Sequence, residues 1–337
     1  MVHVGNEQND RNSESERSKE TDYSLSQGVD LEKGLAFTST GDAIYEPAAP
    51  IEEIKPIISE FIGYMAGLTT VLLQVAHPVV GRGVGIHSEF SVPNRAKDRA
   101  DKTGIYVYVM VFGEPYEKAA MRDYVNKMHG RVKGGQGKTA YYAKDPEGGD
   151  QQHHWSAQLW VAATMYADII RNYEKVYGPI EPPEKAERIY REFSYLGTSL
   201  NMPPELWPKD RAAFWAYYND MIENKLEVTP EAEKVCYDLM HPWKATPWYM
   251  KPVFFMLMPT LKALTVESFP PKIRDQYGLK STRMTRFRNA MVLKSLFAVY
   301  PHLPESIRHH GKNKYMKMMK KMMAKQGIQE FQYPKKR

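Results

Sequence analysis

The segment from Leu72 to Phe90 is mostly apolar, yet polar groups interrupt it repeatedly. Five such side chains occur within it: Gln74, His77, Arg82, His87 and Glu89. Leaving a polar group of this kind buried without a partner costs about 1–3 kcal/mol. The fold must therefore let these side chains satisfy one another, or it must hold a ligand beside them.

The segment from Arg99 to Thr103 predicts a cationic helix face. Residues three and four apart are neighbours on a helix, so Arg99, Lys102 and Thr103 would point the same way. Such a face suits a phosphate or a carboxylate, because Arg binds it bidentately and Thr donates a hydrogen bond. The alternative is a solvated surface. Asp98 lies four residues before Lys102 and Asp101 lies between the two cations, so ordinary ion pairs would give the same pattern.

A single histidine, His129, precedes a basic, glycine-rich stretch that runs to Gly137. A helix could end there. Only the Gly-Lys-Thr end of this stretch fits a phosphate-binding loop, so we do not assign one. Imidazole is a versatile metal ligand, which leaves His129 as a candidate ligand.

Apolar periodicity predicts a chiefly helical chain, and few segments alternate as strands do. Start and stop signals place the helices at 51–67, 69–85, 93–111, 115–130, 153–176, 182–199, 208–225 and 230–240. The segment from Pro242 to Pro271 is rich in proline and aromatic residues, so we expect it to be irregular or broken helix. The fold class is therefore all-α.

Composition favours one large helical domain with an extension at each end. The chain has 337 residues, 42% hydrophobic and 26% charged, which is enough for a sizeable core. Residues 1–40 are polar and charged with few apolar side chains, so we expect them to be disordered. The helical domain then covers 41–308, and a C-terminal helix and tail cover 309–337.

The chain shows neither a secretory signal nor a membrane-spanning segment. The longest apolar candidate, Val253 to Val266, is too short for a bilayer and contains Lys262. The single cysteine, Cys236, is consistent with a reducing compartment. We therefore expect a cytoplasmic protein.

The C-terminal region predicts a basic amphipathic helix. Its apolar face comprises Tyr315, Met316, Met318, Met319, Met322 and Met323, opposite Lys314, Lys317, Lys320, Lys321 and Lys325. This helix could adsorb to an anionic membrane or capture a partner. Docking on its own domain is the commoner outcome. The net charge of +6 comes substantially from this tail, and nucleic-acid motifs are lacking, so we expect no nucleic-acid partner.

Five motifs follow one another along the chain. They are Gln-x-Ala-His-Pro at 74–78 with a His-Ser pair at 87–88, Arg-x-x-Lys-Thr at 99–103, His-x-x-Val-x-Gly at 129–134, Tyr-x-Ala-x-Asp-Pro at 141–146 and Trp-Val-x-Ala-Thr at 160–164. A weaker likeness continues through Glu192, Gly197 and the Met-Pro-Pro at 202–204 to about Gly278. Their combined order and spacing resemble the family of haem-containing oxygenases that includes latex clearing protein, a rubber oxygenase, and the MpaB-type oxygenases of fungal biosynthesis.

One departure from the family pattern concerns the substrate. Many members of the family have a histidine where this chain has Ala162. If that position lines the pocket, the substrate differs here, or His153 or His154 takes the place of that histidine.

The resemblance implies a haem b whose iron is held by His129 and an all-α, globin-like haem-binding core. An axial histidine offers one neutral nitrogen to iron while the other donates to a partner. Covalent attachment is excluded because the chain has no Cys-x-x-Cys-His.

Further roles follow from the same resemblance and from position in the sequence. The Arg99, Lys102 and Thr103 face would anchor or polarise bound groups. His87 would serve in a distal pocket or form a helix-packing hydrogen bond. Glu89 is the nearest candidate general base.

Structural and metal alternatives compete with these assignments. His77 precedes a proline and is expected to have a hydrogen-bonded structural role. His153 and His154 are adjacent, so their side chains diverge and chelate poorly. Neither His-Glu-x-x-His nor a Glu-x-x-His repeat is present.

Together these features predict an oxidoreductase of secondary metabolism. It would be a haem-dependent oxygenase that uses O2 to oxidise or cleave a carbon-carbon double bond or aromatic ring of an apolar isoprenoid or phenolic molecule. Two alternatives are a haem peroxidase or dehydrogenase, and a non-enzymatic haem-binding protein with both axial positions filled. The sequence leaves the substrate and the oligomeric state open.

Overall fold

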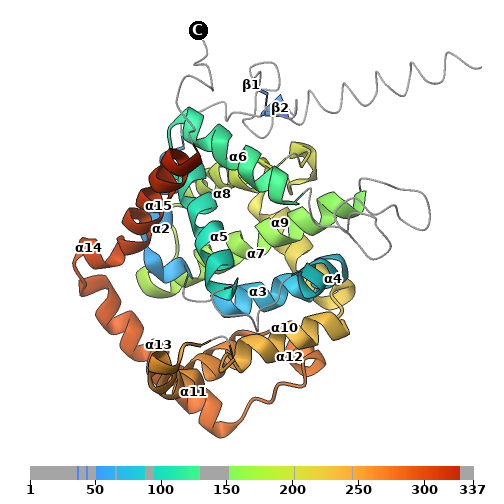
Figure 1. Cartoon of the computed structure of the whole chain (residues 1–337), viewed down its shortest axis with the longest axis vertical. Helices are drawn as coiled ribbons and strands as arrows, with labels where there is room; N and C mark the ends of the chain where they lie inside the picture. The colour runs from blue at the N-terminus through green and yellow to red at the C-terminus, as the bar shows by residue number, and fades with distance from the viewer. Residues whose placement is uncertain are drawn as a thin grey trace, which may run out of the picture.

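The computed structural model describes residues 36–37, 43–44, 51–64, 67–87, 95–129, 152–200, 202–244 and 246–326. The α-helices are α2 Lys55–Ser59, α3 Gly67–Val75, α4 Pro78–His87, α5 Arg95–Phe112, α6 Pro115–His129, α7 Gln152–Tyr177, α8 Pro183–Thr198, α9 Arg211–Asp220, α10 Pro230–Met240, α11 Lys251–Ser268, α12 Pro271–Gln276, α13 Arg283–Val299, α14 Glu305–Arg308 and α15 His310–Gln326. Short 3-10 helices are η1 Phe61–Tyr64, η3 Pro204–Leu206, η5 Trp248–Met250 and η6 Tyr300–His302, and η4 Met221–Lys225 is a π-helix. Two-residue strands, β1 Ala36–Phe37 and β2 Ala43–Ile44, pair antiparallel. The all-α prediction is confirmed (Figure 1), and the globin-like core stays a prediction.

Two predicted helices are divided in the structure. The predicted 69–85 helix is α3 and α4, separated at Ala76 and His77, because Pro78 begins a new helix and disfavours helical backbone in the residue before it. The predicted 51–67 helix is the short α2 followed by η1, with Glu60 extended between them.

The expectation for the segment from Pro242 to Pro271 is wrong over most of its length. Lys251–Ser268 is one helix, α11, with Pro259 inside it. Pro252 lies in its first turn, where proline's fixed backbone angle is compatible with a helix and no hydrogen bond is lost. The predicted disorder of residues 1–40 lies outside the described residues apart from Ala36 and Phe37.

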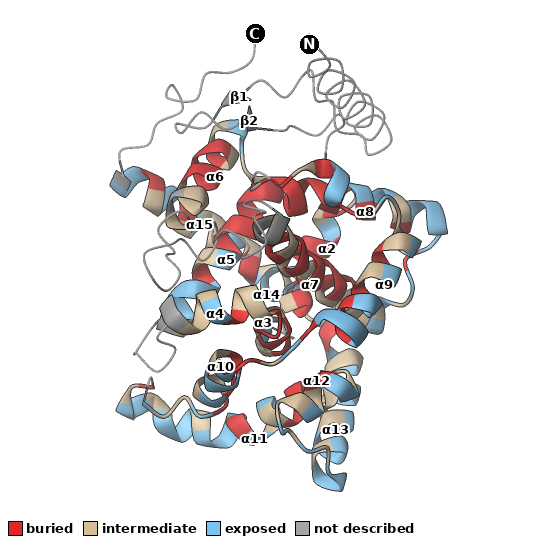
Figure 2. Ribbon diagram, turned by 90° about the vertical axis from the view of Figure 1, so that its right-hand side faces the viewer, coloured by how far each residue is buried: buried red, intermediate tan, exposed pale blue. Residues whose placement is uncertain are grey.

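Helix α7 forms the centre of the core. Trp160, Ala163, Tyr166, Ala167 and Ile170 are fully buried along it, and Figure 2 shows α7 in the buried colour in the middle of the molecule. A helix that is apolar on most sides must be covered on most sides. Here α3, α8, α9 and η1 supply that cover.

Polar side chains tie α3 and the start of α4 to one face of α7. Gln74 Nε2 donates to Thr164 Oγ1 at 3.0 Å. Trp160 Nε1 donates to the carbonyl of Leu73 at 2.9 Å. The ring of His77 lies 3.4 Å from Ser156 Oγ.

The same face of α7 ends in a partly buried carboxylate. Thr70 Oγ1 donates to Asp168 Oδ2. Together with the contacts of Ser156, Trp160 and Thr164, this makes a ladder with a contact at every turn of α7. Gln74, the one of the five polar residues of the Leu72–Phe90 segment that lies in α3, thus has a hydrogen-bond partner within the protein.

The methionine face of α15 packs on α5, beside which α15 runs in Figure 1. Met319 and Met323 are buried in the main core, and Lys314 Nζ donates to Asp101 Oδ1 at 2.7 Å. The helices approach so closely that a Cβ at Gly104 would lie 2.5 Å from the Tyr315 ring. Docking on the domain is thus what the structure shows for these methionines.

Asp168→Asn tests the ladder through its pH dependence. Burial raises the pKa of Asp168 from 3.8 to about 6. The folded protein therefore binds this proton more tightly than the unfolded chain, and stability falls as pH rises from about 4 to about 6. We expect the variant to lack that fall. The difference in free energy of unfolding, variant minus wild type, should therefore be about 2 kcal/mol larger at pH 8 than at pH 4. Urea titrations at both pH values measure this.

Asp220→Asn serves as the control, because Asp220 is exposed at the end of α9. It should shift the free energy of unfolding equally at both pH values. A wild-type stability that rises between pH 4 and pH 6 while the Asp168→Asn value stays level would contradict the assignment.

Candidate functional site

One face of α6 carries three nitrogen-bearing side chains directed into the protein. Arg122, Asn126 and His129 are spaced four and three residues apart, so they lie in one row. Arg122 is 1% exposed. One side-chain nitrogen of each of the three, including Nδ1 of His129, is shielded from solvent. The candidate axial histidine is therefore the last member of a polar row on the inward face of α6.

The buried end of this row faces the C-terminal end of α8. Arg122 Nη1 donates to Tyr195 Oη at 3.1 Å. From α5, Tyr106 Oη donates to the carbonyl of Leu196 at 2.8 Å and lies 2.5 Å from Ser199 Oγ. Burial raises the pKa of Tyr106 to about 12, so it stays a neutral hydroxyl. Tyr106 of α5 and Arg122 of α6 therefore contact the same part of α8.

Two of the sequence-predicted residues fall on the side of α5 that holds Tyr106. Arg99 lies seven residues before Tyr106 and Thr103 lies three before it, so helical periodicity places both on that side. Because α5 and α6 are joined at their near ends by Gly113 and Glu114, the start of α5 and the end of α6 lie at the same end of the pair. Arg99 and Thr103 are both exposed, and their convergence with His129 stays a prediction from this geometry.

Lys102 forms an ion pair along α5. Its ammonium pairs with Asp98 at 2.8 Å, and this hydrogen bond, helped by Tyr124, raises the pKa of Lys102. The surface ion pair that sequence reasoning offered as the alternative is therefore confirmed for Lys102.

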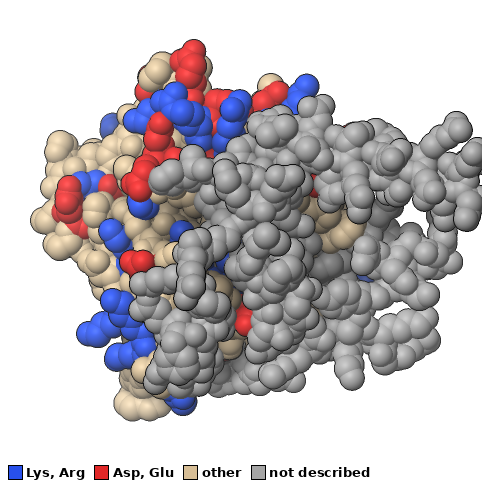
Figure 3. All heavy atoms as spheres, turned by 90° about the horizontal axis from the view of Figure 1, so that it is seen from above, with Lys and Arg blue, Asp and Glu red and all other residues tan. Residues whose placement is uncertain are grey.

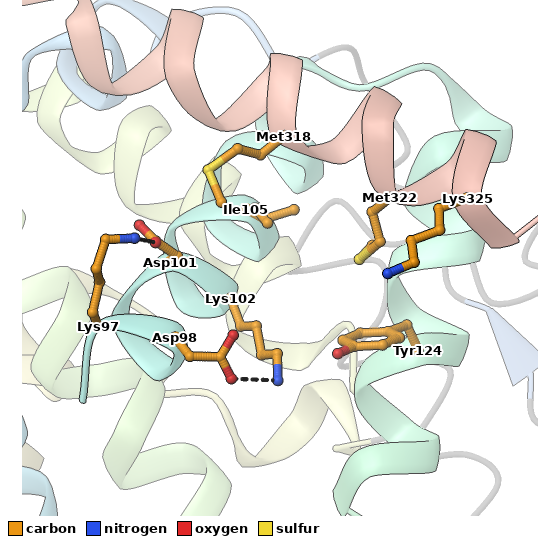
Figure 4. A pocket seen from close by; sticks show the side chains of 9 residues that line it. All are labelled: Lys97, Asp98, Asp101, Lys102, Ile105, Tyr124, Met318, Met322 and Lys325. Carbon is orange, nitrogen blue, oxygen red and sulfur yellow. Dashed lines mark hydrogen bonds and ion pairs between the residues drawn. The ribbon is translucent and has the colours of Figure 1, made fainter. Parts of the chain in front are cut away.

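A cavity of about 660 Å³ adjoins this ion pair (Figure 4). Residues of α5, Tyr124 of α6 and Met318, Met322 and Lys325 of α15 line it. Asp101 also lines it: burial alone would raise its pKa, but the hydrogen bonds from Lys314 and Lys97 lower it. The acids and lysines at this cavity largely neutralise one another.

Several other assigned residues lie outside the described part of the chain. His87 ends α4, but its side chain is not described, and neither is any part of Glu89. The same holds for the side chains of His153 and His154 at the start of α7, and for the Tyr-x-Ala-x-Asp-Pro motif at 141–146. Their roles stay predictions.

Two of the family-like motifs contact each other. Gln74 of the first motif binds Thr164 of the last, and Trp160 binds the backbone of Leu73. The structural role expected for His77 is confirmed by its contact with Ser156. Ala162 is buried, on the row of α7 that also carries Tyr166. These motifs hold α3 on α7.

The weaker resemblance beyond residue 190 also includes residues with structural contacts. The Glu192 carboxylate accepts hydrogen bonds from the backbone amides of Glu53 and Ile54, at 3.1 and 2.8 Å, and so caps the start of α2. A Cβ at Gly197 would lie 2.6 Å from the Trp207 ring, so this position requires glycine for close packing.

Sequence reasoning missed Asn126 and Arg122. The shielded amide nitrogen of Asn126 has no hydrogen-bond partner among the described residues. A buried donor without a partner calls for one, such as a water or a ligand. It lies one turn before His129 on the same face. The spacing of four and three residues from Arg122 to His129 was the signal that could have identified this row.

The donor chemistry of this side fits a haem. A haem iron needs one protein ligand, which an imidazole such as that of His129 can be. Arg99 and Thr103 offer a cation and a hydroxyl for the cofactor's carboxylates, and Asn126 offers an amide donor. Among the described residues, no three His, Cys, Asp or Glu side chains gather to hold a bare metal ion.

Comparison with known proteins was made over the whole chain. A model of the catalytic domain of ER-bound oxygenase mpaB/B′ and rubber oxygenase matches residues 56–300, more than two-thirds of the chain. Uncharacterized proteins of Mycobacterium bovis and Mycobacterium tuberculosis are each 34% identical over 157 residues, which is 45% of this chain. The match spans 57% of the length of each relative. No solved structure matches significantly.

The matched range contains α3 to α13 and thus both the α3–α7 ladder and the α5–α6 row. The match is to a catalytic domain of oxygenases, so it supports oxygenase activity in general terms. This chain belongs to the mpaB and rubber oxygenase catalytic-domain family.

Proposed function

We propose that the protein is a haem b-dependent oxygenase that oxidises or cleaves a carbon-carbon double bond or an aromatic ring of an apolar isoprenoid or phenolic molecule. The observation that carries the haem assignment is the inward row of α6, in which the Asn126 amide, without a hydrogen-bond partner in the described ranges, lies one turn before His129. The family match supports oxygenase chemistry.

His129 would hold the cofactor through one neutral imidazole nitrogen. It is the last residue of α6, and the turns before it are held by the packing of α6 on α5 and by the hydrogen bond from Arg122 to Tyr195 of α8. When bound, haem supplies an iron with an open position for dioxygen and the redox chemistry of oxygenation.

Arg99 and Thr103 would anchor the cofactor's carboxylates or an anionic group of the substrate. Arg99 would supply a planar guanidinium that can bind a carboxylate bidentately, whereas Asp98 already pairs with Lys102. Asn126 Nδ2 would donate a hydrogen bond into the same space. Buried side chains of α5 beneath it, such as Ile105 and Val107, would help keep water out. Glu89 and His87 stay candidates for holding the proton.

The visible absorption spectrum of the purified protein tests the cofactor directly. We expect a near-stoichiometric b-type haem by pyridine haemochrome and a carbon monoxide adduct after dithionite. No Soret band after haem supplementation would remove the cofactor. A six-coordinate, low-spin spectrum that added ligands cannot displace would favour a haem-binding protein without this activity.

The source of the oxygen in the product separates an oxygenase from a peroxidase. With 18O2 and a set of isoprenoid and phenolic compounds, we expect label in the product. Turnover that requires peroxide and incorporates no label would show a peroxidase or dehydrogenase instead.

His129→Ala should abolish stable haem binding while leaving a folded helical protein, because the ring projects from a helix end. Haem stoichiometry and far-ultraviolet circular dichroism measure the two effects. His241→Ala is the matched control, since His241 is exposed after α10, and it should keep full haem content. Stoichiometric haem in His129→Ala would overturn the ligand assignment.

Asn126→Leu should act in opposite directions on the haem-free and the haem-bound protein. Removing a buried donor without a partner relieves a cost of about 1–3 kcal/mol, so the haem-free variant should be at least as stable as the wild type. Haem titration should show weaker binding. Lower stability of the haem-free variant with unchanged haem affinity would make Asn126 a structural residue. Asn224→Leu, at an exposed position in η4, is the control.

Arg99→Gln should weaken haem binding by roughly two- to fivefold, as expected for a partly exposed ion pair. Lys102→Gln should weaken it less, because Lys102 is already paired with Asp98. Titration of the haem-free protein with haem measures both, with exposed Lys234→Gln on α10 as the control. A larger effect from Lys102 than from Arg99 would reverse the proposed roles.

A further inference from the structure

The end of the molecule opposite α6 exposes many large apolar side chains. They lie on η5, α11 and α13, which form the lower end in Figure 1 and carry much exposed colour in Figure 2. We call this surface the α11–α13 face; its members are Trp248, Tyr249, Val253, Phe255, Met256, Leu257, Met284, Phe287 and Met291. Trp248 is 81% exposed, Met256 79% and Phe287 63%. A clustered apolar surface of this kind marks an interaction site.

The same part of the chain is strongly basic. Residues 241–299 contain ten Lys or Arg against only Glu267 and Asp275, a net charge of +8, whereas the whole chain has +6. Glu267 is turned inward to the helix hairpin, since it accepts from Ser281 and Thr285. The end of the molecule around α6, in contrast, shows Asp and Glu near its Lys and Arg (Figure 3).

The two helices of the face are tied to each other and, through η6, to the domain. Glu267 of α11 accepts from Ser281 Oγ at 2.8 Å and Thr285 Oγ1 at 2.5 Å, which ties the end of α11 to the start of α13. Behind the hairpin, Tyr300 Oη donates to Glu60 and accepts from the amide of Ile62. The exposed apolar side chains therefore belong to a packed element.

On α13 the apolar and cationic residues alternate in a way that suits a flat surface. Met284, Phe287 and Met291 form a stripe at spacings of three and four. Three cations, Arg283, Arg288 and Lys294, lie along the same stretch of α13. All six side chains are exposed.

Charge selects among the partners that could cover this face. A second copy of the chain meeting it through a twofold axis would set +8 against +8, so like charges would oppose the contact. An anionic lipid surface reverses that sign. Trp and Tyr favour the bilayer interface, apolar side chains enter the acyl boundary, and Lys and Arg bind anionic headgroups. None of the helices in the described ranges is long and apolar enough to span a bilayer.

We propose that the α11–α13 face binds the surface of an anionic lipid bilayer. The methionines of α15, the element for which the sequence suggested membrane adsorption, are instead packed on α5. This inference is independent of the haem assignment, because α11 and α13 supply none of the residues assigned to haem.

The test is flotation of the full chain with vesicles of phosphatidylcholine containing about 30% phosphatidylserine, compared with pure phosphatidylcholine. We expect binding to the anionic vesicles that weakens as salt rises, because exposed charges are screened. Arg283→Glu/Arg288→Glu/Lys294→Glu should lower the partition coefficient by at least about tenfold, since each cation near the surface contributes. Phe255→Ser/Met256→Ser/Phe287→Ser should lower it even at low salt.

The matched control makes the same charge change on the other basic helix. Lys317, Lys320 and Lys321 are exposed on α15, and their replacement by Glu should leave most of the binding intact. Circular dichroism confirms that each variant is folded. A blue shift of tryptophan fluorescence on vesicles, absent in Trp248→Phe, would place Trp248 in the bilayer interface. This measurement requires no change in the charge of the protein.

Three results would overturn the proposal. These are equal binding to neutral and anionic vesicles or to neither, loss of binding in the α15 variant alone, and a dimer in light scattering that Phe287→Ser dissociates. The last would assign the face to a second copy of the chain.

Discussion

The architecture depends on enclosing α7, a 26-residue helix, in one fixed register. Apolar residues alone would let α3 slide or rotate on α7, because dispersion contacts have little directionality. The hydrogen bonds of Asp168, Thr164, Trp160 and Ser156 fix one register instead. The break at Pro78 then sets where α4 begins. The cost is a carboxylate with a raised pKa inside the ladder.

The candidate site follows from two helices that are joined at one end and diverge in environment along their length. Tyr106 and Arg122 contact the C-terminal part of α8 through hydrogen bonds. Helix periodicity then carries Arg99 and Thr103 along α5, and Asn126 and His129 along α6, beyond these contacts. Side chains on facing helices of a bundle can hold a cofactor in this way without an extra element.

Sequence reasoning predicted the helical class, the end of α6 at His129 and the amphipathic C-terminal helix, because periodicity and end signals are local properties. It offered the ion pair between Asp98 and Lys102 as the alternative to a shared cationic face, because sequence spacing alone does not decide between the two. It missed Asn126 because an asparagine inside a helix carries no signal until its burial is known. The helix α11 was missed because proline density was weighed without regard to the position of each proline in a helix.

The contact between Gly104 and Tyr315 links parts of the chain more than two hundred residues apart. Helix α5 is made well before α15, so the face that receives Tyr315, Met319 and Met323 stays uncovered until α15 has left the ribosome. Long-range contacts of this kind form late. The packing of α5, and with it the placement of Arg99, therefore depends on the synthesis of α15, and a chain terminated before α15 would expose an apolar helix face to chaperones and proteases.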